Sequence, residues 1–458
     1  MSQRQAKDSA KKWKAKAVDY KKENEKLHRQ NKELVKSRNG WKSKCKELKV
    51  KLSKGLSKDK KAKGHHYSLS TVNFLMELYR YGGMSLRSCQ HVLICLNRYL
   101  GLDQKIPSHN TLRNWLCKCG MNRVESVSHQ SGDYVVFVDE SINFGCEKIL
   151  LFLGIPESEI PKNRSLCHSD MEVLHMGVSQ EWKGDQIARE LEKIAVNKTI
   201  KYVVSDEGTN LKKAYKLLDL THIEDCTHIL ANHLKKLYAK DEGFLEFSKL
   251  IGKLRQKWNL SKNNSEYMPP GMRGKMRFAN IFPCVNWAKK MLDKRDDLPL
   301  EVQKELVFLK INEQLITSLI QVSSIFKTVC EDLKNKGFGL IQKQLIFDKL
   351  KTIQSQTPEG LAPKAVIFLE NSKGYLENLT AKSKELAQDF VLCSSDIIES
   401  YFGKFKTKIN SNSRSGLTEF IFTMATFGKH FSVDETKNAL ENIKCKQLRL
   451  VKRPPKAA

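Results

Sequence analysis

Two kinds of hydrophobic pattern alternate between residues 133 and 240. Short runs of consecutive apolar residues predict buried strands, and stretches with apolar residues three or four apart predict amphipathic helices. The predicted strands are 133–141, 148–155, 171–180, 200–208 and 220–230. The predicted helices are 184–196 and 210–218, and a third begins at residue 232. Three strands that can pair antiparallel, then a crossover helix and a parallel strand, predict an α/β core.

Two of the predicted strands end in an acidic residue. Asp139 follows four apolar residues in VVFVDES, and Asp206 lies at the tip of the fourth strand in YVVSDEG. A carboxylate directly after a buried run costs energy unless it has a use. We expect these two strands to be neighbours, which would bring the two aspartates together. Glu140 and Glu207 come next in the chain and should point to the opposite side.

Helical spacing dominates most of the remaining chain. Residues 241–390 predict a long, all-helical region. Three shorter helices are predicted over 67–82, 85–101 and 107–120, with Ser85 and Ser108 at positions suited to N-caps. A tight third helix after two others is typical of a helix-turn-helix unit. A purely structural helical bundle fits the same pattern.

Residues 1–64 carry a seven-residue repeat. Bulky apolar residues recur at Trp13, Tyr20, Leu27, Leu34, Trp41 and Leu48. Three residues before each of them stand Ala10, Ala17, Asn24, Asn31, Arg38 and Cys45. This spacing favours a coiled coil, and asparagine at the second seam position favours a parallel dimer of fixed register. The alternative is a single solvated basic helix, because the seam is thin and Gly40 interrupts it.

Charge adds a partner to this picture. The 458 residues include 80 Lys and Arg against 51 Asp and Glu, a net charge of +29. Residues 1–64 alone hold 23 basic and 7 acidic residues. Such a field attracts polyanions, above all nucleic acid, and no apolar run approaches the roughly 20 residues of a membrane span. The 12 Cys without paired spacing and the charged start of the chain predict an intracellular protein outside the membrane.

A downstream segment, SSDIIESYFGKFK, adds a third acid to the two strand ends. It places Glu399 on a predicted helix with Lys406 seven residues later, so both share one helix face. Asp139, Asp206 and Glu399 followed by Lys406 resemble the DDE signature of transposases and retroviral integrases. The segment DCTH, ending in His228, resembles the Cys/Asp-x-x-His motif that many DDE transposases carry on the strand after the second Asp.

The resemblance covers about a third of the chain, residues 130–240 and 390–430. It implies an RNase H-like α/β core with a large all-α insertion, similar to that of hAT-like transposases, although the flanking wording departs from that family. Asp206 and Glu399 are 193 residues apart, which leaves room for this insertion. The implied units are a basic coiled coil or arm at 1–64, a helix-turn-helix DNA-binding domain at 65–130, the first part of the core at 131–240, the insertion at 241–390, and the final core helix with a basic tail at 391–458.

The same resemblance implies a metal-dependent enzyme that cleaves DNA and transfers strands. Asp139, Asp206 and Glu399 would hold two Mg²⁺ or Mn²⁺ ions, with Asp139 between them, because hard cations prefer carboxylate oxygens. Water would free a 3′ end, and that hydroxyl would attack target DNA. His228 would act near the scissile phosphate or the leaving strand. Asp225 would orient His228 or touch DNA, and Asp396, one turn earlier, could replace Glu399.

Candidate DNA-contacting residues come from several places. Lys406 would contact a phosphate. The start of the third short helix would enter the major groove with His109, Asn110, Arg113 and Asn114. The loop SEYMPPGMRGKMRF would contact phosphates through Arg273, Lys275 and Arg277. In the insertion, stacking on a flipped base could involve Trp258 or Trp287, although core positions suit both better.

The expected partners follow from the family. They are double-stranded DNA, both as transposon terminal inverted repeats and as target, and further copies of the chain in a homodimer or larger assembly. The expected location is on DNA, in the bacterial cytoplasm and nucleoid or in a eukaryotic nucleus. Two alternatives stay open: a domesticated transposase-derived DNA-binding protein without catalysis, and a related RNase H-like nuclease such as a junction resolvase.

Overall fold

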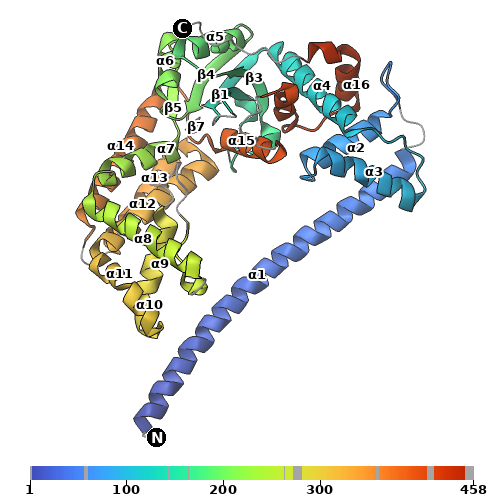
Figure 1. Cartoon of the computed structure of the whole chain (residues 1–458). Coiled ribbons are helices and arrows are strands. Elements are labelled where there is room, and N and C mark those ends of the chain that lie inside the picture. The colour runs from blue at the N-terminus through green and yellow to red at the C-terminus, as the bar shows by residue number, and fades with distance from the viewer. Residues whose placement is uncertain are drawn as a thin grey trace.

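A five-stranded mixed sheet lies at the centre of the molecule, and helices make up most of the remainder (Figure 1). The computed structural model describes residues 3–55, 60–141, 145–162, 164–261, 264–271, 281–356, 360–409 and 417–448. The basic loop residues Arg273, Lys275 and Arg277 lie outside these described residues.

The central sheet has the strand order β3-β2-β1-β4-β5. β2 pairs antiparallel with β1 and β3, whereas β4 is parallel to both β1 and β5. The bounds are β1 Gly132–Glu140, β2 Lys148–Pro156, β3 Glu172–Ser179, β4 Lys198–Ser205 and β5 His222–Glu224. All five strands expected from the sequence are therefore present, in a mixed sheet of the expected pairing.

Four helices frame the site end of this sheet: α5 Gly184–Ala195, α6 Thr209–Leu217, α7 Cys226–Tyr238 and α15 Asp396–Lys408. Alternate residues of β1 point to opposite faces. Val136 and Val138 pack with α5 and α6, whereas Val135 and Phe137 join the larger core on the other face. Asp139 continues this second series and lies on the face turned away from α5 and α6.

The three short helices expected before the sheet are α2 Leu69–Arg80, α3 Leu86–Leu100 and α4 His109–Ser128. Ser85 and Ser108 cap them as predicted, each accepting a hydrogen bond from a backbone N–H three residues later. α4 continues past its predicted end, because it packs along β3 and the C-terminal elements η5 (Glu419–Thr426) and α16 (Val433–Asn442).

The contact between α4 and η5 is unusually close. A Cβ at Gly120 would lie 1.8 Å from the carbonyl oxygen of Phe422, so only glycine allows this approach. Arg80 and Arg123 strengthen the same joint by donating hydrogen bonds to the Lys429 carbonyl. The C-terminal segment therefore packs on the helices of the predicted 65–130 unit as well as on the sheet.

The insertion between α7 and α15 is helical except at its base. Its helices are α8 Glu242–Ser261, α9 Ile281–Asp293, α10 Leu300–Glu305, α11 Val307–Ile311, α12 Glu313–Lys336, α13 Leu340–Ser355 and α14 Pro363–Glu385. Two short strands, β6 Phe338–Gly339 and β7 Phe390–Val391, pair antiparallel. The expectation of an all-α insertion is therefore corrected, because these strands close its base.

The N-terminal segment forms one helix, α1 Gln3–Gly55, which Gly40 does not interrupt. In Figure 1 it extends away from the rest of the molecule as a single rod. The bulky residues of its repeat are exposed where their side chains are described, namely Tyr20, Leu27, Leu34 and Trp41. Within the described ranges, no helix combines the length and apolar composition needed to cross a membrane.

Short 3-10 turns complete the described elements: η1 Glu157–Glu159, η2 His168–Asp170, η3 Ser265–Tyr267, η4 Arg295–Asp297 and η6 Cys445–Gln447.

Candidate active site

Asp139 and Asp206 lie side by side at the ends of two adjacent parallel strands. The β1–β4 register pairs Phe137 with Val204, and the same offset two residues later brings Asp139 level with Asp206. Neighbouring strands are about 4.8 Å apart. The two aspartates expected to meet from the sequence are therefore adjacent. Asp206 also accepts a hydrogen bond from the Gly208 amide at 2.9 Å, which fixes its carboxylate at the strand tip.

The carboxyl of Asp139 is held in an environment that opposes its negative charge. Burial is the main cause, and the charges of Asp206 and Glu399 act in the same direction, so its pKa is raised to about 8. Both neighbours influence Asp139 because they lie close to it, although Glu399 comes from a helix far along the chain. The structure thus brings the three predicted acids into one electrostatic cluster.

Glu399 lies in the first turn of α15, which packs against β1. Partial burial raises its pKa, and the neighbouring His228 works against that shift. Its side chain remains 48% exposed, so it can reach a substrate or an ion. Asp396, the alternative third acid, instead pairs with Lys334 of α12 at 2.6 Å. The local contacts thus favour Glu399 over Asp396.

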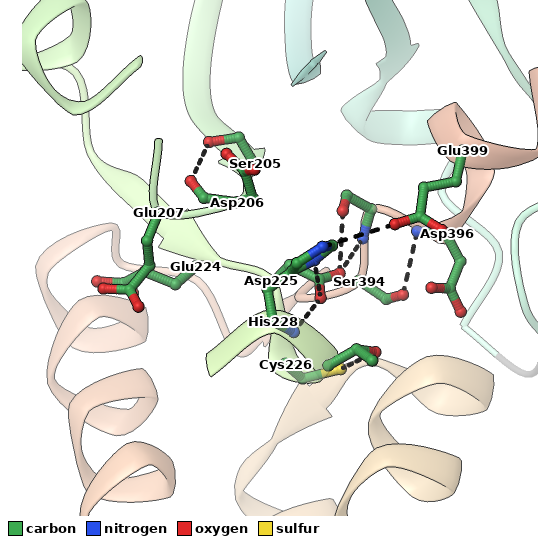
Figure 2. A network of polar contacts seen from close by, with 12 residues as sticks. Ser205, Asp206, Glu207, Glu224, Asp225, Cys226, His228, Ser394, Asp396 and Glu399 are labelled. Carbon is green, nitrogen blue, oxygen red and sulfur yellow. Dashed lines mark hydrogen bonds and ion pairs between the residues drawn. The ribbon is translucent and has the colours of Figure 1, made fainter. Parts of the chain in front are cut away.

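His228 lies between two acids (Figure 2). Its Nδ1 donates to Asp225 Oδ1 at 3.0 Å, and its Nε2 is 3.7 Å from Glu399 Oε1. The hydrogen bond to Asp225 is the main cause that raises the pKa of His228 to about 9. A protonated imidazole donates from both ring nitrogens, so Nε2 can donate on the side where Glu399 lies.

The motif that contains His228 begins a helix and does not lie on a strand, in contrast to the sequence prediction. β5 ends at Glu224, and Asp225 is the N-cap of α7, accepting the His228 amide at 2.8 Å. The physical reason is the capping preference of aspartate, which favours a helix start over a longer strand. Asp225 therefore orients His228 directly, one of the two roles considered for it.

Ser395 is a site residue that the sequence analysis did not identify. Its amide and its hydroxyl both donate to Asp225 Oδ2, at 2.6 and 3.0 Å. The position before the helix 396–408 could have been predicted as an N-cap, but its partner is 170 residues away in the chain. Two backbone contacts hold the same segment: Cys226 N–H donates to the Cys393 carbonyl, and Leu392 N–H to the Tyr202 hydroxyl.

The two glutamates next to the strand aspartates are engaged elsewhere, as expected. Glu140 pairs with Lys148 at 3.0 Å. Glu207 pairs with Lys212 at 2.6 Å and accepts a hydrogen bond from Asn232 at 2.8 Å. These contacts leave Asp139 and Asp206 as the acids of the strand ends that face Glu399.

A divalent cation suits the chemistry of these donors. Within the residues that the structure describes, no three His, Cys, Asp or Glu side chains are arranged as a formed metal site. A carboxyl whose pKa is about 8, next to two further carboxylates, ionises easily only when positive charge lies beside it. Asp139, Asp206 and Glu399 are the residues that could supply oxygen ligands.

The predicted DNA-contacting residues lie in two described regions. His109, Asn110, Arg113 and Asn114 are in the first turns of α4. Arg113 is already engaged, because it pairs with Glu419 at 2.7 Å and lies over the Phe420 ring. Lys406 lies about two turns after Glu399 on α15. Both insertion tryptophans proposed for stacking, Trp258 and Trp287, are buried in the helical core.

No protein-family model and no curated protein matches this chain. The assignment of function therefore depends on the geometry of the site and on the sequence pattern.

Proposed function

We propose that this chain is a DDE transposase, which binds the ends of a mobile DNA element, cuts them and joins them to target DNA. The observation that carries the proposal is the convergence of Asp139, Asp206 and Glu399, which come from two strands and a distant helix. His228 and its partner Asp225 lie beside Glu399, which supports an active site with more than three acids in place.

The sheet supports the finer fold assignment. The order β3-β2-β1-β4-β5, in which only β2 runs antiparallel to its neighbours, is the order expected of an RNase H-like core. The helical insertion between α7 and α15 supports a relationship to hAT-like transposases, because it lies between the second and third acids.

Two divalent cations, Mg²⁺ or Mn²⁺, would supply the charge that stabilises the entering and leaving oxygens of a phosphodiester. Asp139 would lie between them, and Asp206 and Glu399 would each hold one. The other residues act on DNA directly. Protonated His228 would donate a hydrogen bond to the scissile phosphate or the leaving strand, with its ring held by Asp225. Lys406, on the Glu399 face of α15, would contact a phosphate.

The charge and shape of the chain support DNA as the partner. The net charge is +29, and the long basic helix α1 projects away from the sheet (Figure 1). A projecting basic helix can neutralise several phosphates without blocking the site. We propose that its exposed seven-residue repeat also pairs with the α1 of a second copy, because two DNA ends must be held at once.

The proposal is tested with the DNA that flanks the gene. Labelled fragments from both flanks are incubated with the protein and Mg²⁺, together with an unlabelled target plasmid. Wild-type protein is expected to cut at inverted repeats and join the cut ends to the plasmid. Asp206→Asn should abolish both steps while leaving binding of the ends intact, because it removes a metal ligand and no phosphate contact. The matched control Glu207→Gln should retain activity.

The alternatives give different products in the same assay. A related nuclease would cut without joining ends, and a domesticated DNA-binding protein would bind without cutting. If Asp206→Asn also loses binding of the ends, the carboxylate has a structural role and the proposed active site is wrong.

A further inference from the structure

Asp225 is buried and uses both of its carboxylate oxygens. Its side chain is only 1% exposed. Oδ1 accepts the His228 amide at 2.8 Å and the His228 ring at 3.0 Å, and Oδ2 accepts the Ser395 amide at 2.6 Å and its hydroxyl at 3.0 Å. A buried carboxylate is tolerated when it is hydrogen-bonded in this way. Burial works to raise its pKa, but the bonds from His228 and Ser395 outweigh that effect and lower it.

The two oxygens serve two different segments of the candidate site. Oδ1 holds the first turn of α7, which carries His228, and Oδ2 holds the residue immediately before α15, which carries Glu399 one turn later. These segments are 170 residues apart in the chain. One carboxylate therefore fixes how His228 and Glu399 lie relative to each other, and Figure 2 shows the resulting chain of contacts.

We propose that Asp225 is a positioning residue for the carboxylate site: it holds Glu399 at the spacing from Asp139 and Asp206 that binding of divalent cations requires. This inference rests on the proposed function, because it takes Glu399 to be a metal ligand. It extends that function by assigning the control of Glu399 to a residue that touches neither metal nor DNA.

Helix capping alone does not account for this arrangement. An N-cap needs one side-chain oxygen, and serine, threonine or asparagine supplies it as well as aspartate. Burying a full charge is costly, so a capping role by itself would favour a neutral residue. The second oxygen of Asp225 is used entirely by Ser395, and this use requires a carboxylate because both partners are donors.

Asp225 also provides the tether nearest to Glu399. The bonds from Cys226 to Cys393 and from Leu392 to Tyr202 hold the chain two or more residues before Ser395. The ion pair between Lys334 and Asp396 lies on the other side of α15 and is largely exposed, so it can adjust without strain. The Asp225–Ser395 contact is therefore the buried link that sets the start of α15.

A matched control exists elsewhere in the chain. Asp241 accepts the Phe244 amide at 2.7 Å at the start of α8, and its second oxygen pairs with Lys364 of α14. It thus joins a helix start to a distant segment, as Asp225 does, but within the insertion. Asp241→Asn reports the general cost of losing such a link.

The first experiment measures hydrogen exchange of the full chain without metal. Asparagine offers one acceptor oxygen, so Asp225→Asn must give up either His228 or Ser395. We expect amide exchange in residues 394–400 to become at least about tenfold faster, with no comparable change after Asp241→Asn. Unchanged exchange in residues 394–400 would overturn the positioning role, whatever the enzyme does with DNA. If Asp225→Asn does not fold, Ser395→Ala, which removes only a hydroxyl, is measured in its place.

The second experiment measures Mn²⁺-dependent cleavage by Ser395→Ala and Asp225→Asn. A positioning role predicts that the Mn²⁺ concentration for half-maximal rate rises about 10–100-fold in Asp225→Asn, and less in Ser395→Ala, while KM for DNA stays unchanged. A merely structural role predicts a lower melting temperature with the Mn²⁺ requirement unaltered, which would contradict the proposal. Absence of cleavage by wild-type protein would contradict the proposed function, and the exchange experiment would still decide the positioning role.

Discussion

Lys334 forms an ion pair with Asp396 at 2.6 Å, which joins the last turn of α12 to the first turn of α15. The insertion therefore contacts the helix that carries Glu399, three residues before it. The pair also occupies the acid that could have replaced Glu399. Two carboxylates one turn apart thus have different partners, Lys334 for one and His228 for the other.

These partners predict unequal effects of removing each charge. Glu399→Gln should lower Mg²⁺-dependent DNA cleavage by about 10³-fold or more, roughly 4 kcal/mol of barrier, because it removes a metal ligand. Asp396→Asn should lower it less than about tenfold, because an exposed ion pair contributes at most about 1 kcal/mol. The measurement is the single-turnover cleavage rate of both variants. The reverse order of effects would make Asp396 the third acid.

Asp139 predicts a pH-dependent cost in the metal-free protein. Its pKa is about 8 in the folded chain against a reference of 3.8, so the folded state keeps a proton that the unfolded chain releases between these values. Stability therefore falls as pH rises toward 8 and stays low above it. Asp139→Asn should raise the melting temperature of metal-free protein at pH 9 by about 2 °C or more, and change it little at pH 4.

Metal should reverse this cost. Mg²⁺ should raise the melting temperature of wild-type protein at pH 8 and affect Asp139→Asn much less, because an ion that binds only the folded state stabilises it. Equal stabilisation of both proteins by Mg²⁺ would show that the ion binds somewhere else.

Gly120 predicts a severe packing defect. Gly120→Ala would place a Cβ 1.8 Å from the Phe422 carbonyl oxygen, so α4 and η5 would have to move apart. We expect destabilisation of about 3 kcal/mol or more, measured by denaturant unfolding. Gly374→Ala in α14 is the control, since no atom lies within 4 Å of its added Cβ, and it should stabilise the protein by up to about 1 kcal/mol. Equal stability of both variants would argue against the close α4–η5 contact.

The repeat in α1 predicts a parallel dimer. Cys45 lies at the seam position of the repeat and is exposed in the single chain. In a parallel pair of fixed register, the two copies of Cys45 face each other, so mild oxidation should cross-link them in high yield. Leu27→Lys with Leu34→Lys should prevent this cross-link and shift the sedimentation of the full chain toward monomer. Cross-linking that survives both substitutions would exclude the α1 seam as the contact.

Much of the sheet and its acids could be predicted from the sequence, because strand patterns are local. Apolar runs ending in Asp139 and Asp206 identify both strands and both carboxylates. The contacts that complete the site are not local. Ser395 and Lys334 meet their partners across 170 and 62 residues, and no periodicity reports such pairs.

Element boundaries failed where two local preferences compete. Residues 220–230 have the apolar content of a strand, but Asp225 caps a helix and ends β5 at Glu224. Residues 301–335 have continuous helical spacing, yet they divide into α10, α11 and α12 at Leu306 and Asn312. Packing within the insertion decides these breaks, and spacing along the chain does not record it.

The hydrogen bond from Cys226 to Cys393 means that the chain departs from the core and returns to it at almost one point. Everything between these residues is a loop whose ends are already fastened together. The entropy of closing such a loop grows only with the logarithm of its length, so doubling it costs about 0.6 kcal/mol. Lineages could therefore enlarge, trim or exchange this whole module while the start of α15 stays where it is.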